Sequence, residues 1–472
     1  MAGLEELSRD ELLALVAAQA KVIEELSARV ADLEARVGKN SSNSSKPPSS
    51  DGLAKPPPRS MRGKSGRRPG KQPGSPGAAL SQVERPDRRI KHFPASCALC
   101  SRRLRRSRKA GDPVRRQVFD VPEMTVAVTE HELHALACSC GHVTRAKAPA
   151  GATAPAVYGP NVTALAAYLS AQHHIPVGRI VEVLADIAGI EVSTGWVADA
   201  CKRAEQAIAP ANEAIKDAVA AAGVAHFDES VTRVAGRNHW MHTAATATLT
   251  AFHIDGHGRA AASIKAFGIL PRFTGVAVHD AYAGYDGFTA CTHALCNAHA
   301  VRELTGIGEF DAAAREDGWA QTMIDLLGDA HRWVAAYRRD GHTCLPDFKA
   351  DDLRHRWDQT IERALAAHPP RPGKQTPARN LALRLRDRRD EFLRFTTDFA
   401  VAFSNNTAEQ AIRMIKVKTK VSGGFRTLAG AHTFLAIRGY ISTVRKNGLR
   451  AADALCDALL GNPWMPPSHA VT

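Results

Sequence analysis

The first 38 residues carry an apolar pattern that repeats every seven positions. The two series of this repeat are Val16, Ile23, Val30 and Val37, and then Leu12, Gln19, Leu26 and Leu33. β-Branched residues in one seam and mostly leucine in the other favour a parallel two-stranded coiled coil. The alternative is an amphipathic helix that packs on its own chain. We predict a helix over residues 4–38 that dimerises.

A helical period returns after residue 160. It predicts three helices, at Asn161–His174, Val177–Ile187 and Ser193–Ile208, with a turn at Gly189 and a serine cap at the start of the third. Short helices joined by tight turns are typical of a helix-turn-helix, whose last helix enters a DNA groove. The third helix offers few side chains that could read bases, so a small bundle that bridges two domains is an equal alternative.

Strand patterns follow. Gly223–Asp228 and Gly275–Asp280 are short apolar runs that each end in an acid, and His239–Ile254 is rich in threonine, alanine and aromatic residues. These segments predict one mixed sheet, and Ala260–Gly268 predicts a helix between its strands. Two strands that both end in aspartate would place two carboxylates side by side at the edge of the sheet.

A further helix is expected within Asn405–Thr427. Asn405 and Asn406 would cap its free N–H groups, and Glu409 lies in its first turn. The cations on the same side of this helix are Arg413, Lys416 and Lys420. One interpretation is a carboxylate that holds a metal in front of cations that hold phosphate. The other is a solvated amphipathic helix whose acid favours the N-terminal dipole.

Asp228, Asp280 and Glu409 together would make a set of three carboxylates. Such groups repel one another unless a divalent cation lies between them. Hard oxygen ligands suit Mg²⁺, and two such ions can promote an in-line displacement at phosphorus. The competing acids are Glu229, which should point to the opposite face of its strand, and Asp286, Glu303 and Glu309.

Composition adds a basic arm to this picture. The 472 residues carry a formal charge of +14 and are 44% hydrophobic, and residues 39–109 alone contain 19 Lys and Arg against 3 Asp and Glu. Residues 39–80 are rich in Ser, Pro and Gly and cannot bury a core, so they predict a disordered tether or a nonspecific DNA-binding tail. The N-terminus lacks the apolar core of a signal peptide, and prolines interrupt the uncharged stretch Ala148–Gly178. We therefore expect a cytoplasmic protein without a membrane span.

Nine cysteines without a dense framework favour a reducing compartment and metal ligands over disulfides. Cys97, Cys100, Cys138 and Cys140 form two close pairs that could supply the four ligands of a structural zinc ribbon. The residues between the pairs look partly strand-like, as in VRRQVFDVP and MTVAVTEHEL. Unliganded core cysteines are the alternative.

A second candidate zinc site is Cys296 with His299, preceded by Cys291 and His293, for which a hydrogen-bonded structural cluster is equally plausible. The side chains expected to contact DNA phosphates are Arg102, Arg103, Arg105 and Arg106 beside the first cysteine pair, and Arg302, Arg413, Lys416, Lys420 and Arg426 in the second half of the chain. Gly423 and Gly424 would let the backbone approach that DNA strand closely.

Several motifs in this order resemble the DDE transposases of the insertion sequence sixty-six family, of the TnpC type. They are KNSSNSSKPPSSD from Lys39, DES at Asp228–Ser230 before GRNHW, HDAYAGYDGF from His279, HALCNAHAVREL from His293, PGKQTPARNLALRLR, AFSNNTAEQAIR and IRGYISTVRKNG. The resemblance covers nearly the whole chain. It implies that Asp228, Asp280 and Glu409 are the catalytic triad of an RNase H-like fold, with a helical insertion between the second and third acids.

The expected fold is therefore α/β, with an RNase H-like mixed-sheet core. The expected domains are a coiled coil at 1–38, a basic linker at 39–85, a zinc ribbon at 86–150, a helix-turn-helix-like domain at 151–215, the catalytic core at 216–302 and 399–450, a helical insertion at 303–398, and a C-terminal helix and tail at 451–472.

The expected activity is Mg²⁺-dependent cleavage and strand transfer at the terminal inverted repeats of a bacterial insertion sequence. The expected partners are those repeats, target DNA, a second copy of the chain in a dimer or larger synaptic assembly, and small accessory proteins of the same element. The expected location is the bacterial cytoplasm, associated with the nucleoid. The alternatives are an inactive end-binding protein or repressor, and a host nuclease of the same fold.

Overall fold

A computed structural model describes residues 8–40, 43–44, 74, 80–106, 110–149, 151–152, 154–256 and 261–467. The chain divides into two compact units, one of Arg59–Ala127 and one of Met1–Pro58 with Val128–Thr472. Most of the low-complexity stretch 39–80 falls outside the described residues. Within the described ranges, no helix has the length and apolar content that a membrane span requires.

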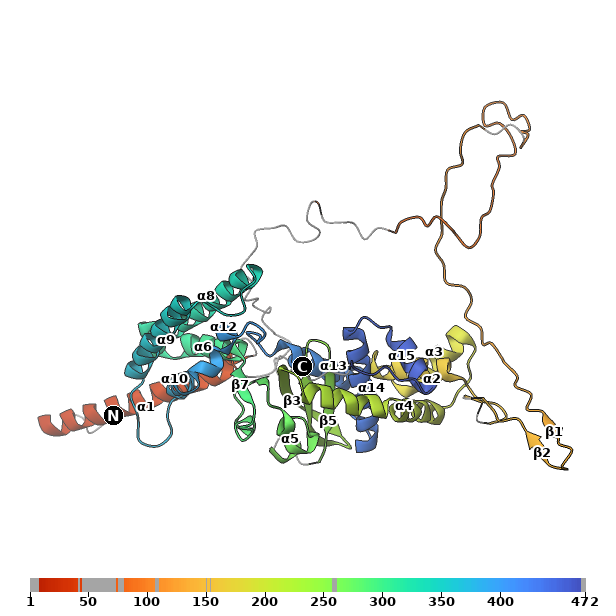
Figure 1. Ribbon diagram of the computed structural model, residues 1–472. Coiled ribbons are helices and arrows are strands. Elements are labelled where there is room, and N and C mark those ends of the chain that lie inside the picture. Colours follow the sequence, from red (N-terminus) through yellow and green to blue (C-terminus); the bar gives the residue numbers. More distant parts are fainter. Residues whose placement is uncertain are drawn as a thin grey trace. The chain divides into compact units, whose positions relative to one another are not determined.

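Helix α1 (Arg9–Gly38) confirms the predicted N-terminal helix (Figure 1). Its heptad side chains are exposed: Val16 is 60% exposed, Ile23 63% and Leu26 56%. An apolar seam of this length in water lacks the burial that stabilises helices in proteins. A helix that pairs with a second copy would expose this seam in the single chain, as observed here.

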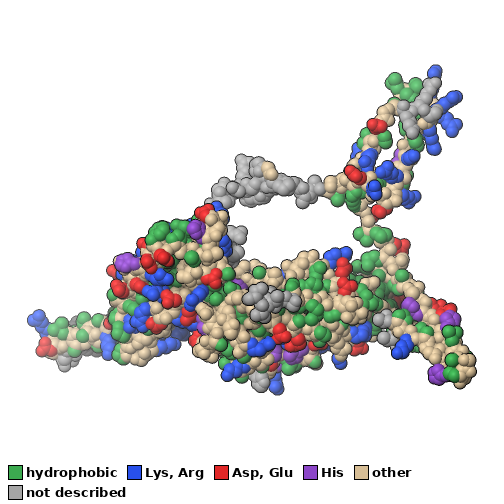
Figure 2. Space-filling model, viewed as in Figure 1, with side chains coloured by type: hydrophobic (Ala, Val, Ile, Leu, Met, Phe, Trp, Pro, Cys, Tyr) green, Lys and Arg blue, Asp and Glu red, His purple; other side chains and the backbone are tan. Residues whose placement is uncertain are grey.

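The smaller unit contains a short bridge between Ser96 and Arg103. In the larger unit, β1 (Ala135–Ala137) and β2 (Val143–Arg145) pair as an antiparallel hairpin. Residues 114–122 and 124–133 form no strands, so the expectation from VRRQVFDVP and MTVAVTEHEL was wrong. Their β-branched residues favour an extended chain, but strand formation also needs a pairing partner. Lys and Arg side chains are prominent on the smaller unit in Figure 2.

The larger unit is built on the mixed sheet that the sequence predicts. Its strands are β3 (Val224–Val234), β4 (Arg237–Ala245), β5 (Thr250–Ile254), β6 (Val276–His279) and β7 (Thr292–Leu295). Their order is β5-β4-β3-β6-β7. The pairs β3–β4 and β4–β5 are antiparallel, whereas β3–β6 and β6–β7 are parallel. Helix α5 (Ala261–Phe267) lies between β5 and β6 in the chain, as predicted.

Strand β3 is longer than the apolar run GVAHFD indicates. It continues past Asp228 to Val234 because it pairs with β4 up to a two-residue turn, in which Ala235 and Gly236 have φ values of 48° and 76°. Positive φ at both positions is the requirement of a type I′ hairpin. Asp228 therefore lies in the middle of its strand, and the expectation that this strand ends in the acid was wrong.

Between the β1–β2 hairpin and the sheet lie α2 (Pro160–Ala171), α3 (Val177–Ala188) and α4 (Thr194–Ala220). Ser193 caps α4 as predicted, accepting the Trp196 N–H at 3.0 Å, and Gly189 is left-handed. Helix α4 runs twelve residues beyond the predicted end at Ile208 and contains Pro210. Apolar residues further along α4 are buried in the same core as the sheet, which stabilises the helix across the proline.

The insertion between β7 and the last core helices is helical, as predicted. It contains α6 (Asn297–Phe310), α7 (Ala312–Asp317), α8 (Trp319–Arg339), α9 (Asp347–Ala367), α10 (Pro377–Asp387), α11 (Arg389–Phe392) and α12 (Arg394–Thr397). These helices pack in a core around Trp319 and Trp357 that also includes residues of β6 and β7, and α11 contacts β7.

Three helices follow the insertion: α13 (Asn406–Ser422), α14 (Leu428–Lys446) and α15 (Ala451–Leu459). Helix α13 packs on β3 and β4, and α14 packs on β5 and α4 (Figure 1). The chain therefore returns to the sheet after the insertion and places the first turn of α13 beside β3.

Candidate active site

The first two acids lie beyond the paired ends of adjacent strands. Strands β3 and β6 are parallel and paired as far as His226 opposite Val278, and Asp228 and Asp280 each follow two residues later in the chain. Strand β6 ends at His279, which leaves Asp280 in the following turn, where its carboxylate accepts the Tyr282 N–H at 3.0 Å. The Asp228 carboxylate accepts the Glu229 N–H at 2.9 Å.

The third acid is positioned by Asn405, which does not act as the predicted cap. No side-chain capping bond is made at the start of α13. The buried Asn405 amide instead donates to the Phe227 carbonyl at 2.7 Å and accepts from His226 Nδ1 at 3.1 Å. Its backbone N–H donates to Cys296 Sγ at 3.2 Å. Asn405 thereby attaches the first turn of α13, with Glu409, to the residue before Asp228.

Asp228 lies in the electrostatic field of the other two acids. Burial raises the pKa of Asp228 well above its usual value, and the charges of Glu229, Glu409 and Asp280 raise it further. Lys416, about two helical turns beyond Glu409, faces the same acids: burial lowers its pKa, and the charges of Asp228 and Glu409 oppose that decrease. A concentration of negative charge at a partly buried point is suited to a bound cation.

Two of the competing acids are engaged elsewhere. Glu303 pairs with Arg384 at 2.5 Å, and Asp286 pairs with Arg388 at 3.0 Å. Neither acid is among the charges that act on Asp228. The geometry therefore favours Glu409 over Glu303 as the third member of the set.

Glu229 lies closer to the site than its strand position suggested. Its carboxylate accepts the Tyr285 hydroxyl at 2.5 Å, and it is the strongest charged influence on Asp228. Tyr285 is buried, and its ring lies 4.5 Å from that of His279, centroid to centroid. Hydrophobic period gives no sign of this tyrosine's role; its position within HDAYAGYDGF is the one signal in the sequence that points to it.

Cys296 and His299 lie at the start of α6, next to Glu409. One ligand atom from each of the three residues lies within 4.8 Å of the others. Glu409 Oε1 is 3.7 Å from His299 Nδ1 and 3.7 Å from Arg302 Nη2. Burial raises the pKa of Cys296 to about 11, with a contribution from Glu409, and burial lowers that of His299 to about 3, with a contribution from Arg302.

Cys291 and His293, the other residues of the second candidate zinc site, belong to a different set of contacts. His293 Nδ1 lies 2.8 Å from His279 Nε2, and its Nε2 lies 3.1 Å from the Phe288 carbonyl. The Cys291 thiol donates to the same carbonyl at 3.2 Å. From the sequence, all four residues were predicted to form one site, and the association of Cys296 and His299 with Glu409 was not predicted.

The two cysteine pairs of the expected ribbon each lie at a hairpin turn. Cys97 donates its N–H to Arg102 and accepts that of Ser101, and Cys138 donates its N–H to His142 at 2.8 Å. Hydrogen bonds from the neighbouring cysteine lower the pKa of Cys97 and of Cys138. One pair belongs to each unit of the chain, and their joint zinc site stays a prediction.

The expected DNA-contacting cations are on the whole accessible. Arg413, Lys420 and Arg426 are exposed, as are Arg102, Arg103, Arg105 and Arg106. Arg302 and Lys416 are half-buried beside the acids. The backbone of β3 lies directly against Gly424. A Cβ at this position would lie 2.9 Å from the Arg233 carbonyl. Contact between Gly424 and β3 thus explains this glycine without DNA.

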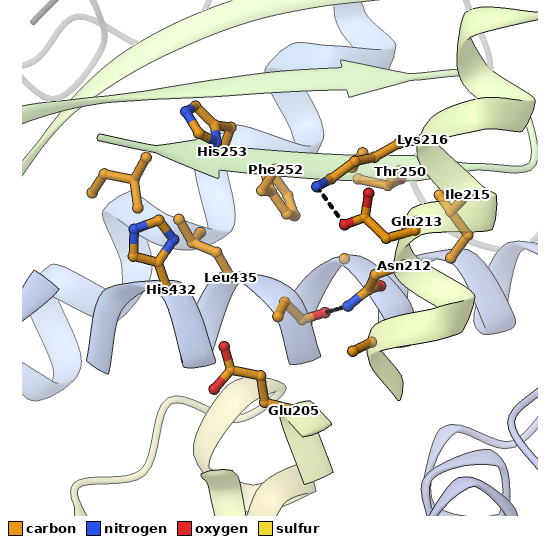
Figure 3. A pocket seen from close by; sticks show the side chains of 15 residues that line it. Glu205, Asn212, Glu213, Ile215, Lys216, Thr250, Phe252, His253, His432 and Leu435 are labelled. Atoms are coloured by element: carbon orange, nitrogen blue, oxygen red, sulfur yellow. Dashed lines mark hydrogen bonds and ion pairs between the residues drawn. The ribbon is translucent and has the colours of Figure 1, made fainter. Parts of the chain in front are cut away.

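A cavity of about 210 Å³ lies away from these acids, between α4, β5 and α14. Figure 3 shows Glu213 with Lys216 on one side of it, and His253 and His432 on the other. Glu213 Oε1 lies 2.8 Å from Lys216 Nζ. None of the three aligned acids lines this cavity.

Comparison with known proteins agrees with the geometry. The family described as "Transposase IS66 family" matches residues 155–433, and a "Family of unknown function (DUF6444)" matches residues 3–81. An uncharacterised protein of Sinorhizobium fredii (strain NBRC 101917 / NGR234), y4hP, is 23% identical over 401 residues, which cover 78% of this chain and 70% of that protein. The first match spans more than half of the chain and includes all three acids. The chain belongs to the IS66 family of transposases.

Proposed function

We propose that the chain is a DDE transposase with an RNase H-like core. It cuts DNA at the terminal inverted repeats of its element and joins the freed 3′ ends to target DNA. The observation that carries this proposal is that Asp280, in the turn after β6, and Glu409, in the first turn of α13, both act electrostatically on Asp228 in the adjacent strand β3. The strand order β5-β4-β3-β6-β7 supports the proposed core.

The residues present fit Mg²⁺. All three acids offer oxygen ligands, and the charges of Glu229, Glu409 and Asp280 add to burial in raising the pKa of Asp228. Mg²⁺ prefers such oxygen ligands and retains open positions for substrate phosphate. When bound, two such ions would supply activation of the attacking oxygen and stabilisation of the leaving oxygen.

The surrounding residues of the chain have separate tasks. Asn405 fixes the distance between Glu409 and β3 through its contacts with Phe227 and His226. Arg302 and Lys416 place positive charge beside the acids, where a DNA phosphate would enter. Arg413, Lys420 and Arg426 bind the flanking phosphates, with affinity that falls as salt rises.

The N-terminal regions recognise DNA and a second copy. Cys97, Cys100, Cys138 and Cys140 bind structural Zn²⁺ in a ribbon that the adjacent arginines hold on DNA, and two hairpin turns of paired cysteines support this assignment. The exposed heptads of α1 dimerise two copies. The active form is a synaptic dimer or larger assembly in the bacterial cytoplasm, with small accessory proteins of the same element as further partners.

The experiment that tests this function is cleavage of labelled linear DNA that carries the end of the element, with Mg²⁺ present. Wild type should nick at the end junction. Asp280→Ala should bind the same DNA and fail to cut, because it lacks one of the three carboxylates. Asp286→Ala is the matched control, since this nearby acid pairs with Arg388 outside the set.

Each other result has a definite meaning. If wild type and Asp280→Ala both bind and neither cuts, even with the accessory proteins added, the chain is an end-binding protein or repressor. If both cut equally, the assignment of the acids is wrong. If wild type cuts DNA irrespective of the element's ends, the activity is that of a nuclease.

A further inference from the structure

We propose that Cys296, His299 and Glu409 bind one transition-metal ion, with Zn²⁺ as the reference ion, and that this ion shares Glu409 with the magnesium site. The coupling between the two ions rests on the proposed function, whereas the binding of the first ion does not. The shared carboxylate makes the two metals weaken each other's binding.

The three ligand atoms are already close to the arrangement that such an ion needs. Zn²⁺ binds sulfur at about 2.3 Å and nitrogen or oxygen at about 2.0–2.2 Å, so ligand atoms in a tetrahedral site are about 3.5 Å apart. His299 Nδ1 and Glu409 Oε1 are 3.7 Å apart, and all three ligand atoms lie within 4.8 Å of one another. Small side-chain rotations would complete the site.

The surroundings hold the ligands in place and leave one nitrogen without a hydrogen bond. Cys296 is 2% exposed and directly precedes α6, and the Asn405 N–H points at its sulfur. His299 Nδ1 is buried, and no described residue forms a hydrogen bond with it. Buried polar atoms normally have a partner. A metal ion bound to this nitrogen would provide one.

The donor set selects the class of ion. A thiolate and an imidazole favour Zn²⁺ and similar transition metals, whereas Mg²⁺ prefers oxygen alone. Three protein ligands leave a fourth tetrahedral position open. This arrangement differs from the closed site of four protein ligands expected for a purely structural ion.

The sharing of Glu409 has a thermodynamic consequence. Glu409 acts electrostatically on Asp228 and also lies in ligand range of His299. A dication held by Glu409 reduces the negative charge available to Mg²⁺, and the same argument holds in reverse. Coupling of this kind is reciprocal: each ion must change the affinity of the other by the same factor.

Binding is tested on the full chain with Co²⁺, whose charge-transfer absorption reports bonds to thiolate. Wild type should bind one more equivalent of Co²⁺ than Cys296→Ser or His299→Asn. Cys291→Ser is the matched control, because Cys291 is also buried but contacts Phe288 instead. The ribbon cysteines are unchanged in all four proteins, so their contribution cancels. If wild type and both ligand variants melted at the same temperature and bound equal equivalents of Co²⁺, the proposed metal site would be wrong.

Coupling is tested by repeating the Co²⁺ titration at saturating Mg²⁺. The affinity of the additional site should fall about tenfold in wild type and remain constant in Asp280→Asn, which lacks a magnesium ligand but keeps Cys296, His299 and Glu409. An unchanged Co²⁺ affinity in wild type would refute the sharing of Glu409. Neither titration requires DNA cleavage, so failure of the proposed activity would be distinguished from failure of the site.

Discussion

At the scale of single residues, His174 is unusual because it is 3% exposed and neither ring nitrogen has a hydrogen-bond partner among the described residues. Burial, together with the positive charge of Arg438, lowers the pKa of His174 to about 4. The residue follows α2 with a φ of 59°, a backbone conformation that histidine accepts more readily than most residues. It is a neutral, buried base.

This environment predicts a loss of stability in mild acid. The pKa is lower in the folded chain than in the unfolded chain, so the unfolded state takes up the proton first. The free energy of unfolding should be unaffected by His174 above about pH 6.5 and should fall by up to about 3 kcal/mol as the pH decreases to about 4.

Urea unfolding at several pH values measures this loss. His174→Asn should flatten the pH dependence in that window, and His131→Asn, which changes an exposed histidine that is not among the charges acting on His174, should leave it unchanged. A slope in His174→Asn equal to that of wild type would show that other groups are responsible.

Glu229 and Tyr285 show where residue-level reasoning from the sequence stops. The acids Asp228 and Asp280 could be predicted because each follows or lies within an apolar run with the period of a strand. The Glu229–Tyr285 hydrogen bond depends on how the turn after β6 folds back, and no local period encodes that contact. The places of these two acids in the chain's strands could therefore be predicted approximately, but the contacts around them could not.

At the scale of elements, the start of α13 depends on Asn405. Asn405→Ala would leave the buried Phe227 carbonyl without its donor and remove the contact with His226. Because a buried group left without its partner costs about 1–3 kcal/mol, we expect destabilisation in that range and a larger proportional loss of DNA cleavage. Asn406→Ala, at an exposed adjacent position, should change both much less.

Chemical unfolding and the cleavage assay on the same preparations measure these two effects. If the Asn405→Ala variant kept the stability and the activity of wild type, α13 would be held on β3 by apolar packing alone. The sequence could place Asn405 at the start of a helix. It could not show that the amide binds a strand 178 residues away rather than its own helix.

A second element-level prediction concerns the loop between α13 and α14. Gly424→Ala would bring a Cβ to 2.9 Å from the backbone oxygen of Arg233, whereas Gly178→Ala, in α3, would meet no atom within 4 Å. We expect the first change to destabilise the chain by about 1–3 kcal/mol. The second should be neutral or stabilise it by up to about 1 kcal/mol.

Thermal melting of both glycine variants measures the difference. If Gly424→Ala had a melting temperature equal to or higher than that of Gly178→Ala, the close contact between this loop and β3 would be wrong. DNA contact would then again be the explanation for the glycine.

At the scale of the whole molecule, the exposed seam of α1 predicts association. Ile23→Lys would place a charge in the seam of the proposed coiled coil, and Ala17→Lys would place the same charge outside both heptad series. Sedimentation velocity of the full chain should show a shift toward monomer for Ile23→Lys alone. If Ile23→Lys remained dimeric to the same extent as wild type, the dimer contact would lie on another surface.

The sequence predicted most of the elements of this molecule, and the mixed sheet among them. Periodicity located the helices, and apolar runs located the strands. The long α4 was underestimated because Pro210 normally ends a helix, and tertiary burial overrides that preference here. The strand-like residues near 113–133 formed no sheet, because a high strand propensity does not by itself provide a second strand to pair with.

The insertion of α6–α12 between β7 and α13 also determines what an incomplete chain can do. A polypeptide that ends anywhere in the insertion already contains the basic arm, both cysteine pairs and the first two acids, but lacks Asn405 and Glu409. A premature stop codon there would, on the proposed function, yield a product that occupies the element's ends without cutting them. Nonsense mutations in this gene would therefore be expected to act as dominant inhibitors of the intact copies.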